Sequence, residues 1–227
     1  MGASRGERQR GRIARQHAGR AARVPLVLGL VLGLAVIATR DAAGADTTLP
    51  RRDLLEHAMR AYQHLEAANR IHNRVLTVID YSMRSSERRL WVLDPRSLRV
   101  LYHDFVAHGR GSAAPEDPDL AVRFGNEPES HRSSIGLFLT GDTYTGKHGE
   151  SLELVGLEPG VNDRALERRI VIHPADYASA SFRAQSGGRL GRSFGCPALD
   201  PAVARPIIDT IRGGSVLYAS GSSSSSD

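Results

Sequence analysis

The chain has 227 residues, of which 41% are hydrophobic and 24% charged, values typical of one globular domain with flanking tails. Eight arginines and only two acids fall in residues 1–45, so the remainder holds 22 basic and 23 acidic groups although the whole chain has a formal net charge of +5. The main part therefore lacks the positive charge expected of a nucleic-acid-binding protein, and a single cysteine excludes an intrachain disulfide framework.

Residues 1–45 have the organisation of a secretory signal peptide. Seven arginines precede the apolar run 26–38, and Ala43-Gly44-Ala45 follows it as an A-x-A cleavage site. As a helix this run would span about 20 Å, less than the hydrocarbon core of about 30 Å, although an uncleaved membrane anchor stays an alternative. We therefore expect cleavage after Ala45, export to the periplasm or cell envelope, and no membrane contact afterwards.

An amphipathic helix is expected next, within an N-terminal helical segment at 46–72. Thr48 is placed to cap this helix, and Pro50 suits its first turn because proline has a fixed φ and lacks an N–H. Apolar residues then recur every three to four positions, the period of a helix with one buried face. These residues are Leu54, Leu55, Ala58, Met59, Tyr62 and Leu65.

Residues 73–220 are expected to form one β-rich domain. From 75 to 81 the period changes to two, so that alternate side chains face opposite sides of a strand. Further strands are expected at 90–93 and 98–106, joined by a type I turn that begins at Asp94-Pro95. This antiparallel hairpin excludes a doubly wound nucleotide-binding fold.

His103 and His108 are the histidines that most suggest a metal site, because Asp104 lies beside them. On a strand, however, residues five positions apart face opposite sides, and the spacing H-x4-H matches no helical zinc motif. We therefore expect neither a metal site nor a cofactor.

The stretch 168–199 holds the residues with the strongest indication of chemistry. The β-branched run 170–172 predicts a strand that ends at His173, and 22 residues separate this histidine from Cys196, the only cysteine. A lone cysteine is often only a small buried hydrophobic residue. Here, however, Ser193, Gly195 and Pro197 indicate a turn with outward-pointing N–H groups, an environment suited to a nucleophile. A neighbouring imidazolium would lower the pKa of the thiol from about 8.5 to roughly 3.5–7.5.

A short helix and a last strand are expected after this stretch. Asp200 is placed to cap the helix, Pro201 to begin it, and Pro206 to kink or restart it. Gly213-Gly214 should end the helix before a strand at 215–218. The tail 221–227 is of low complexity and expected to be disordered.

These residues resemble the L,D-transpeptidase family of bacterial cell-wall enzymes, with its YkuD-type catalytic domain. Its signature is a histidine, a loop and then Ser/Thr-His-Gly-Cys, and the matching positions here are His173, Ser193, Gly195 and Cys196. The resemblance implies a mainly β fold, an L,D-transpeptidase-like β-sandwich or barrel with an N-terminal helix and a short C-terminal helix. The catalytic domain would occupy 73–220.

The sequence departs from the family pattern at two positions. Phe194 stands in place of the second histidine of the signature, and Ala198 stands where the family usually carries Arg or Asn, two residues past the cysteine. These departures leave substrate preference and, to a lesser degree, the reaction outcome open. The residues that match the nucleophile and the base are both present.

The resemblance also implies roles for individual residues. Cys196 would be the nucleophile and His173 the base, oriented by a backbone carbonyl, with Asp176 as the side-chain alternative. Backbone N–H groups of Ser193, Phe194, Gly195 and Cys196 would form the oxyanion hole.

Other residues are weaker candidates for substrate contacts. By analogy with the family, a flap-like hairpin within 140–154 would place Tyr144, Lys147 or His148 at the cleft, although an exposed hairpin is an equal alternative. Arg192 beside the motif would pair with substrate carboxylates, although arginine is so abundant that chance proximity also explains its position.

The expected reaction is acyl transfer on the stem peptides of peptidoglycan through a thioester on Cys196, carried out by a monomer. Water in place of an acceptor amine would make the protein an L,D-carboxypeptidase, and an inactive wall-binding homologue is a further alternative. A thiol redox protein is disfavoured, because no second cysteine forms a C-x-x-C pair.

Overall fold

The computed structural model describes residues 48–147 and 149–222. The expected signal peptide at 1–45, His148 and residues 223–227 of the expected tail lie outside these ranges. Within them, none of the helices combines the length and the apolar character needed to cross a membrane.

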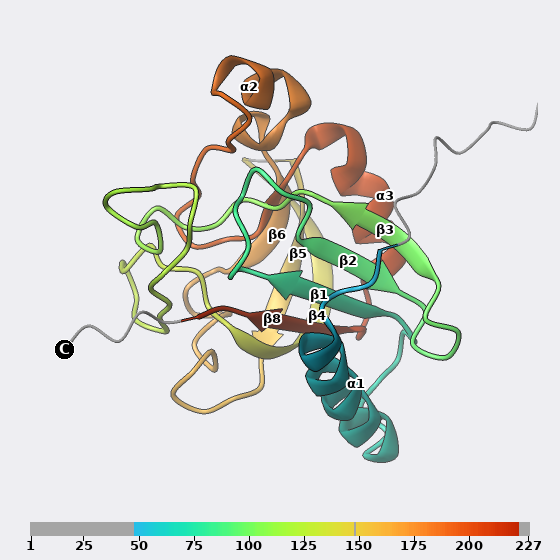
Figure 1. The fold of residues 1–227 in the computed structure, drawn as a ribbon. Helices are drawn as coiled ribbons and strands as arrows, with labels where there is room; N and C mark the ends of the chain where they lie inside the picture. Colours follow the sequence, from blue (N-terminus) through green and yellow to red (C-terminus); the bar gives the residue numbers. More distant parts are fainter. Residues whose placement is uncertain (1–47, 148, 223–227) are drawn as a thin grey trace, which may run out of the picture. The chain divides into compact units, whose positions relative to one another are not determined.

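The described part of the chain forms an eight-stranded sheet with three α-helices and one 3₁₀ turn (Figure 1). The helices are α1 (Arg52–Ala67), α2 (Ala180–Gln185) and α3 (Pro201–Ile211), and the 3₁₀ turn is η1 (Asp176–Ala178). The strands are β1 (Leu76–Asp80), β2 (Leu90–Leu93), β3 (Val100–Asp104), β4 (Gly136–Gly146), β5 (Gly149–Gly156), β6 (Val171–Pro174), β7 (Ala198–Leu199) and β8 (Val216–Ser220). Their order in the sheet is β3-β2-β1-β8-β4-β5-β6-β7.

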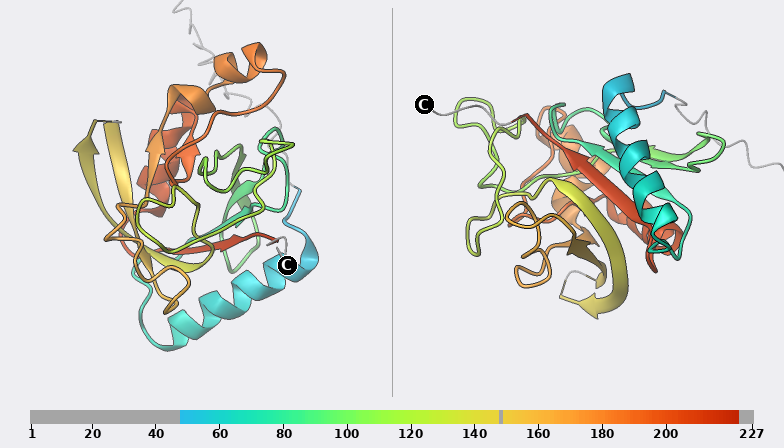
Figure 2. Two further views of the ribbon diagram at one scale, coloured as in Figure 1. Left: turned by 90° about the vertical axis from the view of Figure 1, so that its left-hand side faces the viewer. Right: turned by 90° about the horizontal axis from the view of Figure 1, so that it is seen from below.

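Two pairings in this sheet are parallel, β1 with β8 and β6 with β7, and the others are antiparallel. The antiparallel hairpin expected at 90–106 is present as β2 and β3. The longest hairpin, β4–β5, bends strongly (Figure 2, right), and its register shifts between Thr140 and Thr143. The mainly β fold with an N-terminal and a C-terminal helix is thereby confirmed.

Both faces of the sheet are covered, which explains why its central strands are buried on both sides. Along β1, Ile79 belongs to the core cluster that contains α3, whereas Leu76 and Val78 belong to the cluster that contains α1. The alternation expected from 75 to 81 is therefore confirmed, with apolar contacts on each side. Helix α1 lies along the sheet beside β8 (Figure 2, right).

The buried face of α1 is the expected one, but its cap is not. Leu54, Ala58, Tyr62 and Leu65 are buried, as the period predicted. The N-cap position is Arg51, which makes no side-chain capping bond, so the prediction that Thr48 caps the helix was wrong. The Thr48 carbonyl instead accepts a hydrogen bond from Trp91 Nε1 at 2.8 Å, a tertiary contact that holds this segment away from the cap position.

The start of α3 confirms its local signals. The side chain of Asp200 accepts a hydrogen bond from Ala202 N at 2.9 Å, and Pro201 occupies the first turn. The helix does not restart at Pro206. This proline lies within α3, on the solvent-exposed side of the helix. Proline leaves the Ala202 carbonyl without its helical donor, and because Ala202 is exposed, water can replace that donor. Gly213 and Gly214, both with positive φ, follow the helix before β8.

Candidate active site

Cys196 lies in a tight turn that Ser193 closes from inside. The Ser193 side chain is only 3% exposed; its Oγ donates to the Cys196 carbonyl at 2.6 Å and accepts from Gly195 N at 3.1 Å. Ser193 N donates to the carbonyl of His108 at 3.0 Å, which ties the turn to the rest of the domain. A hydroxyl group is needed here, because it both donates and accepts a hydrogen bond.

Gly195 meets a steric requirement of the same turn. Its φ is +119°, a backbone conformation that residues with a Cβ rarely adopt, and a Cβ placed there would lie 2.8 Å from the Arg132 carbonyl oxygen. Of the four N–H groups in 193–196, those of Ser193 and Gly195 are used inside the protein. Those of Phe194 and Cys196 make no hydrogen bond to the described residues.

His173 reaches the turn through the pairing of two short strands. In the parallel register of β6 and β7, His173 is opposite Ala198, and His173 N donates to the Pro197 carbonyl at 3.4 Å. The ring is 3% exposed, and its Nδ1 lies 2.8 Å from the Pro174 carbonyl oxygen. Because a carbonyl only accepts, Nδ1 carries the proton in this contact, as the resemblance implied for a backbone-oriented histidine.

The Cys196 thiol is half-buried and donates a weak hydrogen bond to the Arg169 carbonyl, with Sγ 3.6 Å from the oxygen. Burial raises the pKa of the thiol above its usual value and outweighs the Val171 N–H and the Arg168 guanidinium, which favour the thiolate. The sequence led us to expect a lowered pKa, and that expectation was wrong, because desolvation of the thiolate depends on tertiary burial. The raised pKa favours the neutral thiol at Cys196.

A neutral resting thiol predicts how alkylation of Cys196 depends on pH. Only the thiolate reacts with iodoacetamide, so the rate should rise about tenfold per pH unit below the pKa of the thiol. Since this pKa is raised, the rate should still be rising beyond about pH 9 in the folded protein. The same protein unfolded in urea is the matched control, and its alkylation rate should level off at a lower pH. A folded-state rate that levels off below pH 8 would instead indicate a thiolate–imidazolium pair.

The thiol and the imidazole line one hollow of about 480 Å³. The residues around it come from the β4–β5 hairpin, from the segment that leads into β6 and from the cysteine turn. They include Tyr144, Lys147, Ser151, Arg168, Arg169, Val171, His173, Tyr177, Arg192, Ser193, Phe194 and Cys196. Seven of the sequence-predicted residues thus line one hollow, namely Tyr144, Lys147, His173, Arg192, Ser193, Phe194 and Cys196. Gly195 and Asp176 do not line it, and His148 lies outside the described ranges.

Arg192 lines this hollow, but its guanidinium is bound to the protein. It donates to the Gly191 carbonyl at 2.9 Å, to Ser85 Oγ at 3.3 Å and to the Pro118 carbonyl. These bonds anchor the cysteine turn to two neighbouring loops. A substrate contact by Arg192 stays a prediction.

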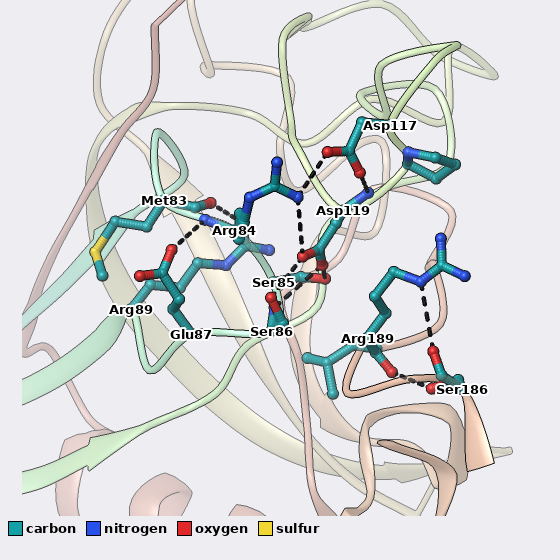
Figure 3. A network of polar contacts seen from close by, with 12 residues as sticks. Met83, Arg84, Ser85, Ser86, Glu87, Arg89, Asp117, Asp119, Ser186 and Arg189 are labelled. Carbon is teal, nitrogen blue, oxygen red and sulfur yellow. Dashed lines mark hydrogen bonds and ion pairs between the residues drawn. The ribbon is translucent and has the colours of Figure 1, made fainter. Parts of the chain in front are cut away.

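The two loops that receive Arg192 are joined by a network of polar contacts (Figure 3). The Asp119 carboxylate accepts hydrogen bonds from the hydroxyls of Ser85 and Ser86, and Arg84 forms ion pairs with both Asp117 and Asp119. Through the hydrogen bond from Arg192 to Ser85 Oγ, this network supports the chain just before Cys196.

Phe194, at the position of the missing signature histidine, points outward and is 62% exposed. The Arg110 guanidinium lies 4.4 Å from the centre of its ring, and the His131 ring lies 4.8 Å from it. These contacts fix an aromatic surface next to Cys196. Sequence reasoning missed Arg169 and Tyr177, because only the folded chain brings them to the hollow.

Comparison with known proteins gives a family but no near relative. The model of the L,D-transpeptidase catalytic domain matches residues 47–220, whereas no functionally curated protein matches the sequence. Among solved structures, an L,D-transpeptidase from Mycobacterium smegmatis is 16% identical, with a TM-score of 0.38, over 65% of this chain and 58% of that one. The cell-shape-determining protein Pgp2 (K307A mutant) from Campylobacter jejuni is 12% identical, with a TM-score of 0.44, over 78% of this chain and 58% of that one.

This chain therefore spans less than two thirds of the length of these solved proteins. The family model, in contrast, covers nearly all of the described residues, including every strand and the turn that carries Cys196. The chain belongs to the L,D-transpeptidase catalytic domain family.

Proposed function

We propose that this protein is an exported cysteine acyltransferase that joins stem peptides of peptidoglycan, with Cys196 as nucleophile and His173 as base. One observation carries the proposal. Although 23 positions apart in sequence, the two residues line the same hollow, because the pairing of β6 with β7 brings their segments together. His173 lies on β6, and Cys196 lies in the turn that leads into β7, so the strand pairing supports the relative position of the proposed base and nucleophile.

In the first half-reaction, the thiol of Cys196 attacks the carbonyl of the diaminopimelate residue in the donor stem. His173 accepts the thiol proton as the C–S bond forms, and then gives it to the amine of the terminal D-residue as the C–N bond breaks. A thioester remains on Cys196. A base is required because burial keeps the resting thiol protonated.

In the second half-reaction, the acceptor amine gives a proton to His173 and attacks the thioester carbonyl. The new amide bond forms, the C–S bond breaks, and the proton returns from His173 to the sulfur. The contact between Nδ1 and the Pro174 carbonyl keeps the imidazole in one orientation and would stabilise its charged form between these steps.

The backbone N–H groups of Phe194 and Cys196 are the proposed oxyanion donors. They are the two of the cysteine turn with no partner among the described residues. One well-placed donor of this kind stabilises a tetrahedral intermediate by roughly 3 kcal/mol. The left-handed Gly195 between them sets the direction of both groups.

The proposal is tested by incubating the purified protein with tetrapeptide-stem muropeptides and identifying the products by mass spectrometry. Cross-linked dimers, with loss of the terminal D-residue, are the expected products. Tripeptide stems alone would show that water is the acceptor and that the protein is an L,D-carboxypeptidase. Unchanged muropeptides would contradict an enzymatic function and favour a wall-binding homologue.

A further inference from the structure

Arg169 occupies the point where three hollows meet. It lines the hollow of Cys196 and His173, a neighbouring one of about 320 Å³ that reaches Glu153, and another of about 390 Å³ that reaches Glu167. Among the described residues, Arg169 is common to all three. A peptide lying across the nucleophile in either direction would therefore pass this side chain.

The backbone of Arg169 fixes its position relative to the nucleophile. Its φ is +54°, in the left-handed region, and its carbonyl accepts the hydrogen bond from Cys196 Sγ. A left-handed conformation costs a residue with a Cβ about 1–2 kcal/mol, so it persists only where the surroundings determine it. Here the Arg169 N–H donates to the Leu166 carbonyl at 3.0 Å, closing the turn that precedes β6.

The guanidinium of Arg169 is exposed and makes no hydrogen bond or ion pair with the described residues. Its neighbour Arg168 is the opposite case: it donates to the carbonyls of Gly125 and Arg132, both at 2.6 Å. Two acids line one adjoining hollow: Glu167 is ion-paired with Arg164, and a carboxylate oxygen of Glu129 lies 3.8 Å from His131 Nε2. Arg169 is thus a cation beside Cys196 whose guanidinium donors are all available, as far as the described part of the chain shows.

The family usually carries Arg or Asn two residues past the cysteine, but in this chain that position supplies no guanidinium. It is occupied by Ala198, which is fully buried in β7. Lys147 at the tip of the β4–β5 hairpin is the other cation of the hollow whose side chain has no partner among the described residues. Arg169 is favoured over Lys147 because its own backbone contacts the thiol and because a guanidinium binds a carboxylate through two parallel hydrogen bonds.

We infer that Arg169 binds a free carboxylate of the donor stem peptide and thereby determines which stems are accepted. The inference rests on the proposed function. Two carboxylates of a tetrapeptide stem lie near the attacked carbonyl, one on the terminal D-residue and one on the diaminopimelate side chain. The chemistry of recognition is the same for both.

Binding to a Cys196→Ala protein tests this inference without turnover. Calorimetry would compare the free-acid tetrapeptide with two analogues, one amidated at the terminal carboxylate and one at the diaminopimelate side chain. Adding Arg169→Gln should weaken binding of the free acid about 10- to 100-fold. In the parent protein, the free acid should bind more tightly than the analogue whose amide replaces the carboxylate bound by Arg169. This difference in affinity should disappear in Arg169→Gln, and the analogue concerned identifies the carboxylate. Arg169→Asn, which tolerates the left-handed backbone, should behave alike, and Arg169→Lys should retain part of the affinity.

Arg52→Gln on the exposed face of α1 is the matched control and should change nothing. Affinity within twofold of the parent protein in both Arg169→Gln and Arg169→Asn would overturn the inference. A 10- to 100-fold loss in Lys147→Gln, with no loss in the Arg169 variants, would overturn it as well. A parent that binds no stem peptide would overturn it as well. Failure of the proposed function is seen separately, as absence of muropeptide products from the protein that retains Cys196.

Discussion

Cys196→Ala should abolish the processing of stem peptides, with a loss of about 10³-fold or more, and leave the fold intact. Without the nucleophile, no covalent intermediate forms. Any residual rate acceleration then comes from substrate binding and the oxyanion donors alone. The structural cost should be small, because the thiol is half-buried and the hydrogen bond that it donates, to the Arg169 carbonyl, is weak. Product analysis by mass spectrometry measures the loss, and thermal unfolding checks the fold.

A second readout of the same variant separates chemistry from binding. A carbapenem, expected from the family resemblance to acylate the nucleophile, should add its mass to the parent protein and not to Cys196→Ala. Because Cys196 is the only cysteine, no other thiol in the chain can take up the label. Turnover that survives in the variant, or a label that stays, would show that another residue is the nucleophile.

The sequence predicted the strands well but said little about their arrangement. Local period identified β1, β2 and the strand before His173, since alternation and β-branched runs are properties of neighbouring residues. Strand order depends on pairing over long distances. The parallel partner of β1 is β8, which begins only at Val216 and is inserted between β1 and β4. No local pattern near either strand specifies that pairing.

Helix caps show the same division between local and tertiary information. Asp200 caps α3 as predicted, because both the acceptor and the donor of its capping bond lie within three residues. Thr48 is not the cap, because the N-cap position lies three residues later, at Arg51, and the Thr48 carbonyl accepts a hydrogen bond from Trp91, 43 residues away. A capping signal can therefore be overruled by a contact that only the folded chain creates.

The candidate site divides in a similar way. Cys196 and His173 could be proposed from the sequence, because a lone cysteine in a Ser/Gly turn and a histidine at a strand end are visible there. The raised pKa of the thiol was missed, since burial comes from distant segments. Arg169 was also missed, because its left-handed backbone and its place between three hollows have no sequence signature. In an arginine-rich chain, only hydrogen bonding separates an available guanidinium from an anchored one.

Arg89→Met should lower the free energy of unfolding by about 3 kcal/mol or more, the largest loss of stability that we expect from one side chain. Arg89 is fully buried, and burial lowers its pKa to about 10, so it stays protonated at neutral pH. Its guanidinium donates to the Val106 carbonyl at 2.8 Å, to the Met83 carbonyl at 2.7 Å and to His108 Nδ1 at 2.8 Å.

Methionine fills much of the same volume but donates no hydrogen bond, so these buried acceptors lose their partner. Each such loss costs about 1–3 kcal/mol, a large share of the 5–15 kcal/mol that stabilises a typical domain. In thermal unfolding the midpoint should fall by about 6 °C or more. Activity should fall too, because the carbonyl of His108 receives Ser193 N in the nucleophile turn.

Arg88→Met is the matched control. This neighbouring arginine is exposed, and its guanidinium lies 5.6 Å from the ring centre of Phe105, so its loss should change the free energy of unfolding by less than about 1 kcal/mol. Equal stability of the two variants would show that water replaces the buried donors of Arg89. In that case the turn that carries Cys196 would be supported chiefly by the hydrogen bonds that Arg192 donates to Ser85 and Pro118.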